Sequence, residues 1–412
     1  MVGIGVVGFF AQAGWATLNF SALPMWVQYR LHQGALLGLV IGAFIVTEAS
    51  LRPVLGAWSD RIGHKPVMLL GPTLGIFTSV ATPFMPNAFL LVPLRALDGI
   101  GLAGFWPAGY SMIADTIGEE RRGTGTSVLN GSGMAGIALG WFVGGLANDL
   151  TAKLAASFYF VSLMFLVTVL AGAILLPEPV RAARHRPHAE PRAGWLTLPK
   201  RRDVARIVWS VRDMLVFNVV VFTGIGLLMP VFKLYAYERY HFSETLIGAM
   251  VAPGAAALGA VAVPLGRLSD RWGVLRSVRY GMALCAVGMW LIALSPSLMA
   301  AMVGTVMLGA GFMAAYPAWM AVASGAGPPG QRGRIVGTVG MAEGLGAVIG
   351  VAIGPVIYAS RWSPFPRLGV THITLPFYFS ALLLTLATVL AFTWVRVRRR
   401  RAAQAAREAR PE

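Results

Sequence analysis

Apolar stretches long enough to cross a membrane as helices recur along the whole chain, with short polar or basic segments between them. A helix needs about 20 mostly apolar residues to span a hydrocarbon core, and only backbone that satisfies its own hydrogen bonds is stable there. The pattern therefore predicts twelve membrane-spanning helices. We place them at residues 4–29, 34–58, 66–85, 88–114, 124–148, 155–176, 213–237, 244–266, 277–295, 297–322, 334–359 and 373–395.

The chain also repeats itself. A polar loop, Gly56–Gly63, returns as Gly266–Gly273, 210 positions later. The same offset pairs, without any insertion, Gly101 with Gly311, Trp106 with Tyr316 and Gly140 with Gly350. Six spans per repeat give both halves the same orientation, as a parallel duplication requires. We predict an all-α membrane protein with two six-helix bundles (1–176 and 213–395), a linker (177–212) and a tail (396–412).

Composition and charge support a membrane protein and suggest its orientation. Hydrophobic residues make up 56% of the chain and charged residues only 12%, about half the charge of a soluble domain. Most Lys and Arg residues lie on the side of the repeated loops, the linker and the C-terminus. Since short cytoplasmic loops collect basic residues, we predict cytoplasmic termini in a multi-pass protein of the cell membrane. This asymmetry explains the net charge of +17, so no nucleic-acid partner is expected.

The sequence lacks the usual marks of an enzyme or a metalloprotein. Cys285 is its single cysteine, which excludes an intrachain disulfide, and no His and Cys cluster has metal-ligand spacing. No nucleophile or phosphate-binding motif occurs in a suitable context. We expect no catalytic residues, no metal and no cofactor, with a proton as the coupling ion and the monomer as the functional form. The linker is interpreted as a solvated connection, with a docking site for a soluble partner as the alternative.

The repeated loop resembles a family motif. In major facilitator superfamily transporters the loop between spans 2 and 3 reads roughly G-x-L-x-D-R-x-G-R-K. The first copy here holds Gly56, Asp60, Arg61, Gly63 and Lys65, with His64 in place of an arginine, and the second holds Gly266, Leu268, Asp270, Arg271 and Gly273. The chain is thus similar to this superfamily over essentially its full length, and it resembles the twelve-span drug:proton antiporter branch.

The resemblance implies a role for this loop as a conformational latch that stabilises the state closed to the cytoplasm. That role is carried over to Gly56, Asp60, Arg61, Gly63 and Lys65, and in the second copy to Asp270 and Arg271. An ordinary turn with basic cytoplasmic residues is the alternative for the second copy.

Two further segments resemble antiporter patterns. Arg95–Gly101 is similar to R-x-x-Q-G-x-G, with Asp98 in place of Gln. The span-5 pattern G-x-x-x-G-P-x-x-G-G is matched at Gly136, Gly140, Gly144 and Gly145, but Trp141 stands where Pro belongs. Small residues four positions apart also allow close helix packing, so these glycines have a purely structural alternative.

Five charged residues lie in the middle of predicted spans, and none has a charged equivalent in the other repeat: Glu48, Arg52, Arg95, Asp98 and Glu343. A charge at the bilayer centre costs about 2.5–3.5 kcal/mol on insertion scales, so such residues pair, face a cavity or carry protons. All five are proton-coupling candidates. Glu48 with Arg52, and Arg95 with Asp98, can instead form intrahelical pairs.

Glu343 is the first candidate for a proton site, because it lies mid-span with no ionisable residue three or four positions away. Lys233, near the outer end of span 7, is interpreted as a lysine that snorkels to the interface, with a substrate-binding role as the alternative.

The resemblance also implies a central cavity lined by spans 1, 4, 7 and 10. Candidates to line it are Gln12, Trp15, Asn19, Trp106, Tyr110, Asn218, Tyr316 and Trp319. Aromatic rings with a few amides suit a bulky, partly apolar molecule, although packing is the alternative role for each ring.

We therefore predict secondary active export of small amphipathic or drug-like molecules in exchange for protons, by alternating access. One alternative is proton-coupled uptake of a metabolite such as an organic acid or a sugar. Another is a membrane receptor or scaffold that transports nothing.

Overall fold

The computed structural model describes residues 1–117, 122–177, 209, 211–251, 272–295, 297–324 and 332–408. Within these residues the chain is helical and contains no β-strand, only an isolated bridge between Phe365 and Val370. The predicted all-α class is therefore confirmed for the described part of the chain. Asp270, Arg271 and most of the predicted linker lie outside it.

Helices of the first repeat follow the predicted spans closely. They are α1 (Val2–Ala16), α3 (Leu37–Ile62), α4 (His64–Ala81), α5 (Ala88–Thr116), α6 (Arg122–Thr151) and α7 (Ala156–Leu175). The rest of predicted span 1 consists of wide π-helical turns, η1 (Thr17–Ala22) and η2 (Trp26–Arg30), on either side of α2 (Leu23–Met25). Short 3₁₀ turns, η3 (Gly34–Leu36) and η4 (Thr82–Phe84), complete the connections.

The second repeat contains α9 (Arg212–Leu228), α10 (Phe232–Tyr240), α12 (Val274–Leu294), α13 (Leu298–Ser324), α14 (Arg332–Ala359) and α15 (Leu375–Glu408). A 3₁₀ turn, η7 (Pro366–Leu368), precedes α15. Residues 244–251 are also helical and are the described part of predicted span 8.

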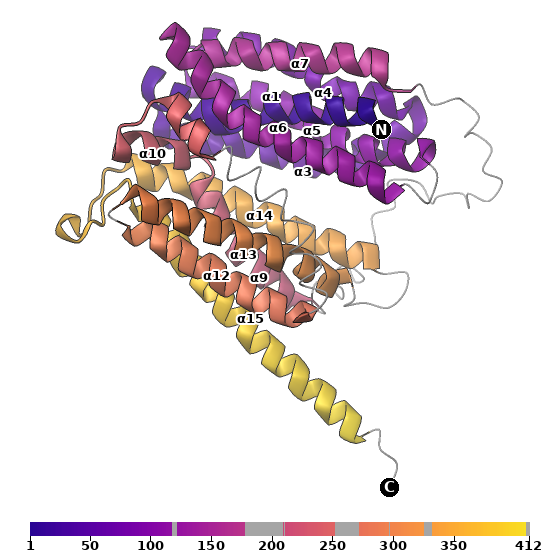
Figure 1. Ribbon diagram of the computed structural model, residues 1–412, viewed down its shortest axis with the longest axis vertical. Coiled ribbons are helices and arrows are strands. Elements are labelled where there is room, and N and C mark those ends of the chain that lie inside the picture. Colours follow the sequence, from indigo (N-terminus) through magenta and orange to yellow (C-terminus); the bar gives the residue numbers. More distant parts are fainter. Residues whose placement is uncertain are drawn as a thin grey trace. The chain divides into compact units, whose positions relative to one another are not determined.

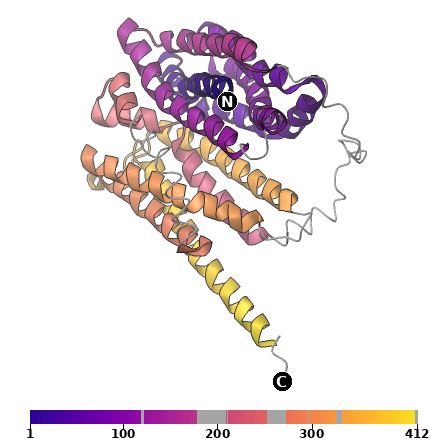
Figure 2. The same cartoon turned by 45° about the vertical axis from the view of Figure 1, so that its right-hand side comes forward.

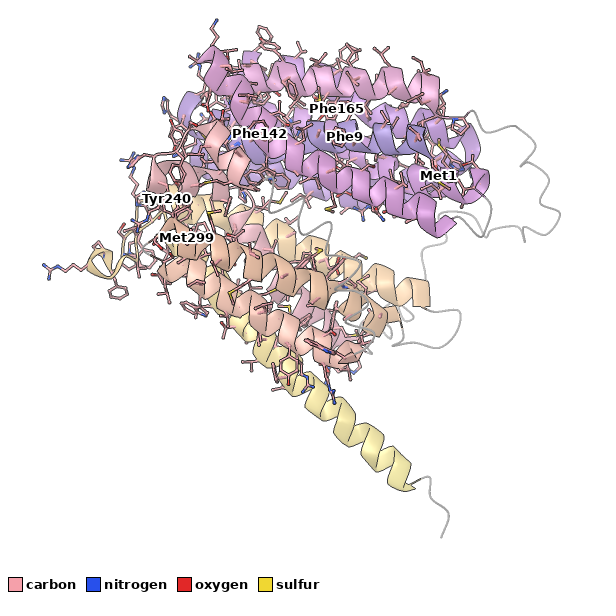
Figure 3. The ribbon with its side chains drawn as sticks, viewed as in Figure 1. Met1, Phe9, Phe142, Phe165, Tyr240 and Met299 are labelled. Atoms are coloured by element: carbon pink, nitrogen blue, oxygen red, sulfur yellow. The ribbon has the colours of Figure 1, made fainter. Side chains whose placement is uncertain are left out.

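Nine helices of the described residues are long and apolar enough to cross a membrane, or ten if α9 and α10 count as one broken span. They correspond to predicted spans 1–4, 6 and 9–12, with span 7 as the broken pair, and α6 covers predicted span 5. Large apolar side chains such as Met299, which is 72% exposed, point outward from the helices (Figure 3). The total of twelve and the cytoplasmic termini stay predictions.

The described residues pack into two units. The first comprises those of Met1–Pro199, Met229–Gly259 and Val351–Ser360, and the second those of Lys200–Leu228, Ala260–Gly350 and Arg361–Glu412. Within each unit neighbouring helices run side by side, as α4 with α5 and α12 with α13 (Figures 1 and 2). Two segments of the second repeat, 229–251 and 351–360, thus pack with the first repeat. The predicted division into bundles at 176 and 213 stays a prediction.

The last glycine of the repeated loop has a positive φ in both copies. Gly63 separates α3 from α4 with φ of 106°, and Gly273 precedes α12 with φ of 87°. Residues with a Cβ rarely adopt these angles, so glycine is required at both turns. The two copies therefore share the positive φ of this glycine as well as a sequence.

Small residues of α6 and α14 allow equivalent close crossings in the two repeats. A Cβ on Gly140 would lie 2.6 Å from the carbonyl oxygen of Ala13 on α1. A Cβ on Gly350 would collide in the same way with the carbonyl of Thr223 on α9, which is 210 positions after Ala13. These contacts confirm the packing interpretation of Gly140 and Gly350, since neither position has room for a side chain.

We expect Gly140→Ala and Gly350→Ala each to lower the free energy of unfolding by about 1–3 kcal/mol, because the added methyl group overpacks a backbone contact. Thermal unfolding in detergent measures the effect. Gly131→Ala and Gly340→Ala are matched controls in the same helices, because a Cβ at either position meets nothing within 4 Å. Equal destabilisation by all four substitutions would contradict the crossing geometry.

Candidate functional site

A buried ion pair links three elements of the first unit. Arg95 and Asp98, one turn apart on α5, are 1% and 2% exposed and pair through Arg95 Nη1 and Asp98 Oδ2. Thr78 Oγ1 on α4 donates to Asp98 Oδ1 at 2.5 Å, and Arg95 Nη2 donates to Asn19 Oδ1 at 2.7 Å. The guanidinium also lies over the ring of Phe44, 4.8 Å from its centroid. The predicted intrahelical pair is therefore present, and it is joined to predicted spans 1 and 3.

The wide turn η1 presents Asn19 to this pair. Pro24 is the second residue after the turn and has no N–H to donate, which favours a local departure from the α-helical pattern. Thr17 Oγ1 donates to the carbonyls of Ala13 (2.8 Å) and Gly140 (3.0 Å), and Asn19 Nδ2 donates to the Trp15 carbonyl (2.9 Å). Local side-chain bonds thus hold the turn and leave the amide oxygen of Asn19 for Arg95.

The second predicted charge pair lies nearer the surface. Arg52 and Glu48 on α3 form an ion pair at the i, i+4 spacing, and the Arg52 side chain is 55% exposed. The intrahelical interpretation of these two residues is therefore confirmed. Such a pair with one exposed partner contributes little to stability.

Glu343 has a different environment in the second unit. Its Oε1 accepts a hydrogen bond from Asn218 Nδ2 at 3.3 Å, and its Oε2 accepts one from Tyr316 Oη at 3.2 Å. Asn218 is 1% exposed, and its Nδ2 also lies 3.3 Å from the Val339 carbonyl. Three residues predicted separately, on α9, α13 and α14, are thus brought together.

A small pocket lies beside this group. Its lining comes from α9, α12 and α13 and is largely aromatic: Phe217, Asn218, Val221, Phe222, Val278, Met282, Phe312, Ala315, Tyr316 and Trp319. The ring of Phe312 stacks on Tyr316 with centroids 5.2 Å apart, and Phe217 contacts Trp319 at 4.2 Å. Both donors to Glu343 line this pocket, so a polar corner and an apolar wall lie side by side.

The other predicted cavity residues lie in the first unit. Trp15 is 3% exposed and packs between Phe105 and Phe165, with centroids 5.1 and 5.5 Å away. Trp106 stacks on Tyr110 at 5.8 Å, and Gln12 and Trp106 both lie beside Gly133. Tyr110 is 40% exposed and donates through Oη to Asn130 Oδ1 at 2.8 Å. Contact with a substrate stays a prediction for these residues.

The first loop copy is anchored within its own unit. Lys65 Nζ donates to the carbonyls of Ala173 (2.8 Å) and Leu176 (3.1 Å) at the C-terminal end of α7, where a cation is favoured. His64, which replaces the usual arginine, lies 3.0 Å from Asp115 through Nε2 and Oδ2. Arg61 is exposed, and the Gly56 carbonyl accepts a bond from Ser59.

The side chain of Asp60 lies outside the described residues, as do Asp270 and Arg271. The latch role of the loop stays a prediction.

The interpretation of Lys233 as a snorkelling lysine is wrong. Its side chain is 1% exposed and donates through Nζ to Glu244 Oε2 at 2.5 Å. Glu244 and its further partner Asn148 were not among the predicted site residues. Spacing did not reveal the pair, because its members are eleven positions apart and lie on different helical segments.

Comparison with known proteins assigns the chain to a family. The family model of the Major Facilitator Superfamily matches residues 4–225 and 214–411. Multidrug resistance protein 1 of Bacillus subtilis is 23% identical over 375 residues, covering 89% of this chain and 90% of that protein.

Among solved structures, a nucleoside transporter, NupG, has a TM-score of 0.73 at 14% identity over 96% of this chain and 98% of its own. A D-xylose-proton symporter has a TM-score of 0.73 at 15% identity, over 95% of this chain and 96% of its own. These likenesses show a shared fold. With the matches to the family model, they lead to one assignment: the chain belongs to the Major Facilitator Superfamily and is a multi-pass membrane transporter of small molecules, not an enzyme.

Proposed function

We propose that the protein exports small amphipathic molecules across the cell membrane in exchange for protons. The observation that carries the proposal is Glu343, whose carboxylate is held by Asn218 and Tyr316 at the edge of an aromatic pocket. An apolar wall with a few convergent polar groups is the usual form of a small-molecule site. Similarity to a multidrug resistance protein supports export as the direction.

In the proposed cycle Glu343 binds either a proton or the polar end of the substrate. Its donors Asn218 and Tyr316 are neutral groups that can also accept a hydrogen bond, so they can satisfy the carboxyl group with or without its proton. The pocket rings bind the apolar part of the substrate. A proton that enters from outside would displace the substrate there, and its release inside would reset the site, as alternating access requires.

The solved neighbours include a nucleoside transporter and a D-xylose-proton symporter. At such low identity they support the fold and do not favour uptake. The direction of coupling separates export from symport: antiport predicts that the substrate leaves the compartment that protons enter, and symport predicts that both enter together.

Glu343→Gln keeps the size of the side chain and removes its exchangeable acidic proton. We expect this variant to reduce ethidium flux driven by an imposed pH gradient in proteoliposomes to the level of protein-free liposomes. Glu48→Gln is the control, because the Glu48 pair has a largely exposed partner, and it should retain flux. If Glu343→Gln preserves flux and its dependence on the gradient, the proposed proton role of Glu343 is lost.

The aromatic wall should determine affinity rather than coupling. Phe312→Ala removes a ring that lines the pocket, and burial of such a ring contributes about 1.5–3 kcal/mol. We therefore expect the KM for ethidium to rise about tenfold or more, while flux still follows the pH gradient. Phe379→Ala on α15, where the ring is 39% exposed, should leave KM unchanged. An equal rise in both variants would contradict the assignment of this pocket.

The Arg95 and Asp98 pair is expected to stabilise the fold. Asp98→Asn leaves a buried guanidinium without its counter-charge, which typically costs about 3–5 kcal/mol of stability. The double variant Arg95→Met/Asp98→Asn removes both charges and should recover most of that loss, measured by thermal unfolding in detergent. A stable double variant that has lost gradient-driven flux would instead assign the pair to proton coupling.

A further inference from the structure

A second buried ion pair, distinct from that of Arg95 and Asp98, lies in the first unit. Lys233 on α10 is 1% exposed, and its Nζ donates to Glu244 Oε2 at 2.5 Å. The same ammonium group donates to Ser21 Oγ at 2.6 Å and lies 3.4 Å from the Ser21 carbonyl oxygen. We call this group of four residues the Lys233 cluster: Ser21, Asn148, Lys233 and Glu244.

Asn148 on α6 holds the other side of the cluster. Its Nδ2 lies 3.2 and 3.1 Å from the two carboxylate oxygens of Glu244, and its Oδ1 accepts a bond from Ser157 N at 3.0 Å. The backbones also approach closely, since a Cβ on Gly145 would collide with the Glu244 carbonyl. Thr245 N donates to the carboxylate of Asp149 at 2.8 Å. Hydrogen bonds and close backbone packing thus hold the start of helical segment 244–251 against the end of α6.

The cluster joins the two sequence repeats. Ser21 and Asn148 belong to the first repeat, whereas Lys233 and Glu244 belong to segment 229–251 of the second. A neighbouring contact has the same character: Tyr29 Oη donates to Glu238 Oε1 at 2.8 Å. In Figures 1 and 2, α10 lies beside the ends of the first-repeat helices. These ends are opposite the Gly56–Gly63 loop and, in the predicted orientation, non-cytoplasmic.

The division of bonds within the cluster has a physical consequence. The ion pair itself lies inside segment 229–251, and only the bonds to Ser21 and Asn148 cross to the first repeat. If the segment moved away, the two charges would leave together and become hydrated. If one charge is removed while the segment stays in place, the other is left buried without its counter-charge, which is strongly unfavourable. Loss of one charge therefore disfavours the closed arrangement, in which segment 229–251 packs against the first repeat. It does not disfavour the open arrangement, in which the segment has moved away and the remaining charge is hydrated.

We infer that Lys233 and Glu244 form a latch that holds segment 229–251 against Ser21 and Asn148, closing the non-cytoplasmic end and releasing it once per transport cycle. The inference rests on the proposed function, because the latch is inferred to open during the proposed transport cycle. The geometry of the latch itself is independent of the substrate.

Distances between spin labels test the latch without any transport assay. Labels are placed through Leu150→Cys on α6 and Leu246→Cys on segment 244–251, which are 77% and 42% exposed, in a Cys285→Ser background. In the parent protein without substrate we expect a predominantly short distance. Lys233→Met and Glu244→Gln should each raise the ratio of long to short distances about tenfold or more.

The double variant Lys233→Met/Glu244→Gln is the decisive comparison, because it buries no unpaired charge and should return to the short distance. Lys153→Met is the matched control at an exposed lysine near the same end of α6 and should leave the distance unchanged. The latch is excluded if both single variants keep the short distance, or if the double variant opens as far as they do. A failure of ethidium transport in the parent would refute the proposed substrate and leave these distances unaffected.

Discussion

Membrane hydrocarbon offers no water to a polar group, so a polar side chain within a spanning helix has to be satisfied by the protein itself. This constraint explains the contacts that Arg95 and Asp98 make in the interior of the first unit. Arg95 and Asp98 neutralise each other and receive further bonds from Asn19 and Thr78. The wide turn η1 contributes to this, because it places the amide oxygen of Asn19 where it can accept a hydrogen bond from the Arg95 guanidinium.

Three carboxylates of the described helices accept hydrogen bonds from different kinds of donor. Asp98 and Glu244 are buried, and each accepts a hydrogen bond from a cationic side chain that holds it in place. Glu343 accepts from the neutral amide of Asn218 and the neutral hydroxyl of Tyr316. Neutral donors hold a carboxyl group in position without committing it to one protonation state. This property is compatible with the proton-binding role that we propose for Glu343.

Duplication explains which features are shared by the two repeats. Gly63 and Gly273 make the same turn, and Gly140 and Gly350 make the same close crossing, because both repeats need the same backbone path. The charged residues in the middle of the spans are not shared, since Glu48, Arg52, Arg95, Asp98 and Glu343 have no charged equivalent in the other repeat. A duplicated scaffold whose halves differ in their polar side chains can therefore hold a proton site in one half and a structural ion pair in the other.

The sequence by itself determined the helical membrane architecture, the repeat and the turns at Gly63 and Gly273, since hydropathy, a constant offset and the need for positive φ are local properties of the chain. It also predicted the pair Arg95 and Asp98, which are one helical turn apart. Only the tertiary structure decided that Glu343 meets Asn218, 125 positions away, and that Lys233 is buried against Glu244. Contacts between helices depend on how each helix is rotated about its axis, and packing sets that rotation rather than spacing along the chain.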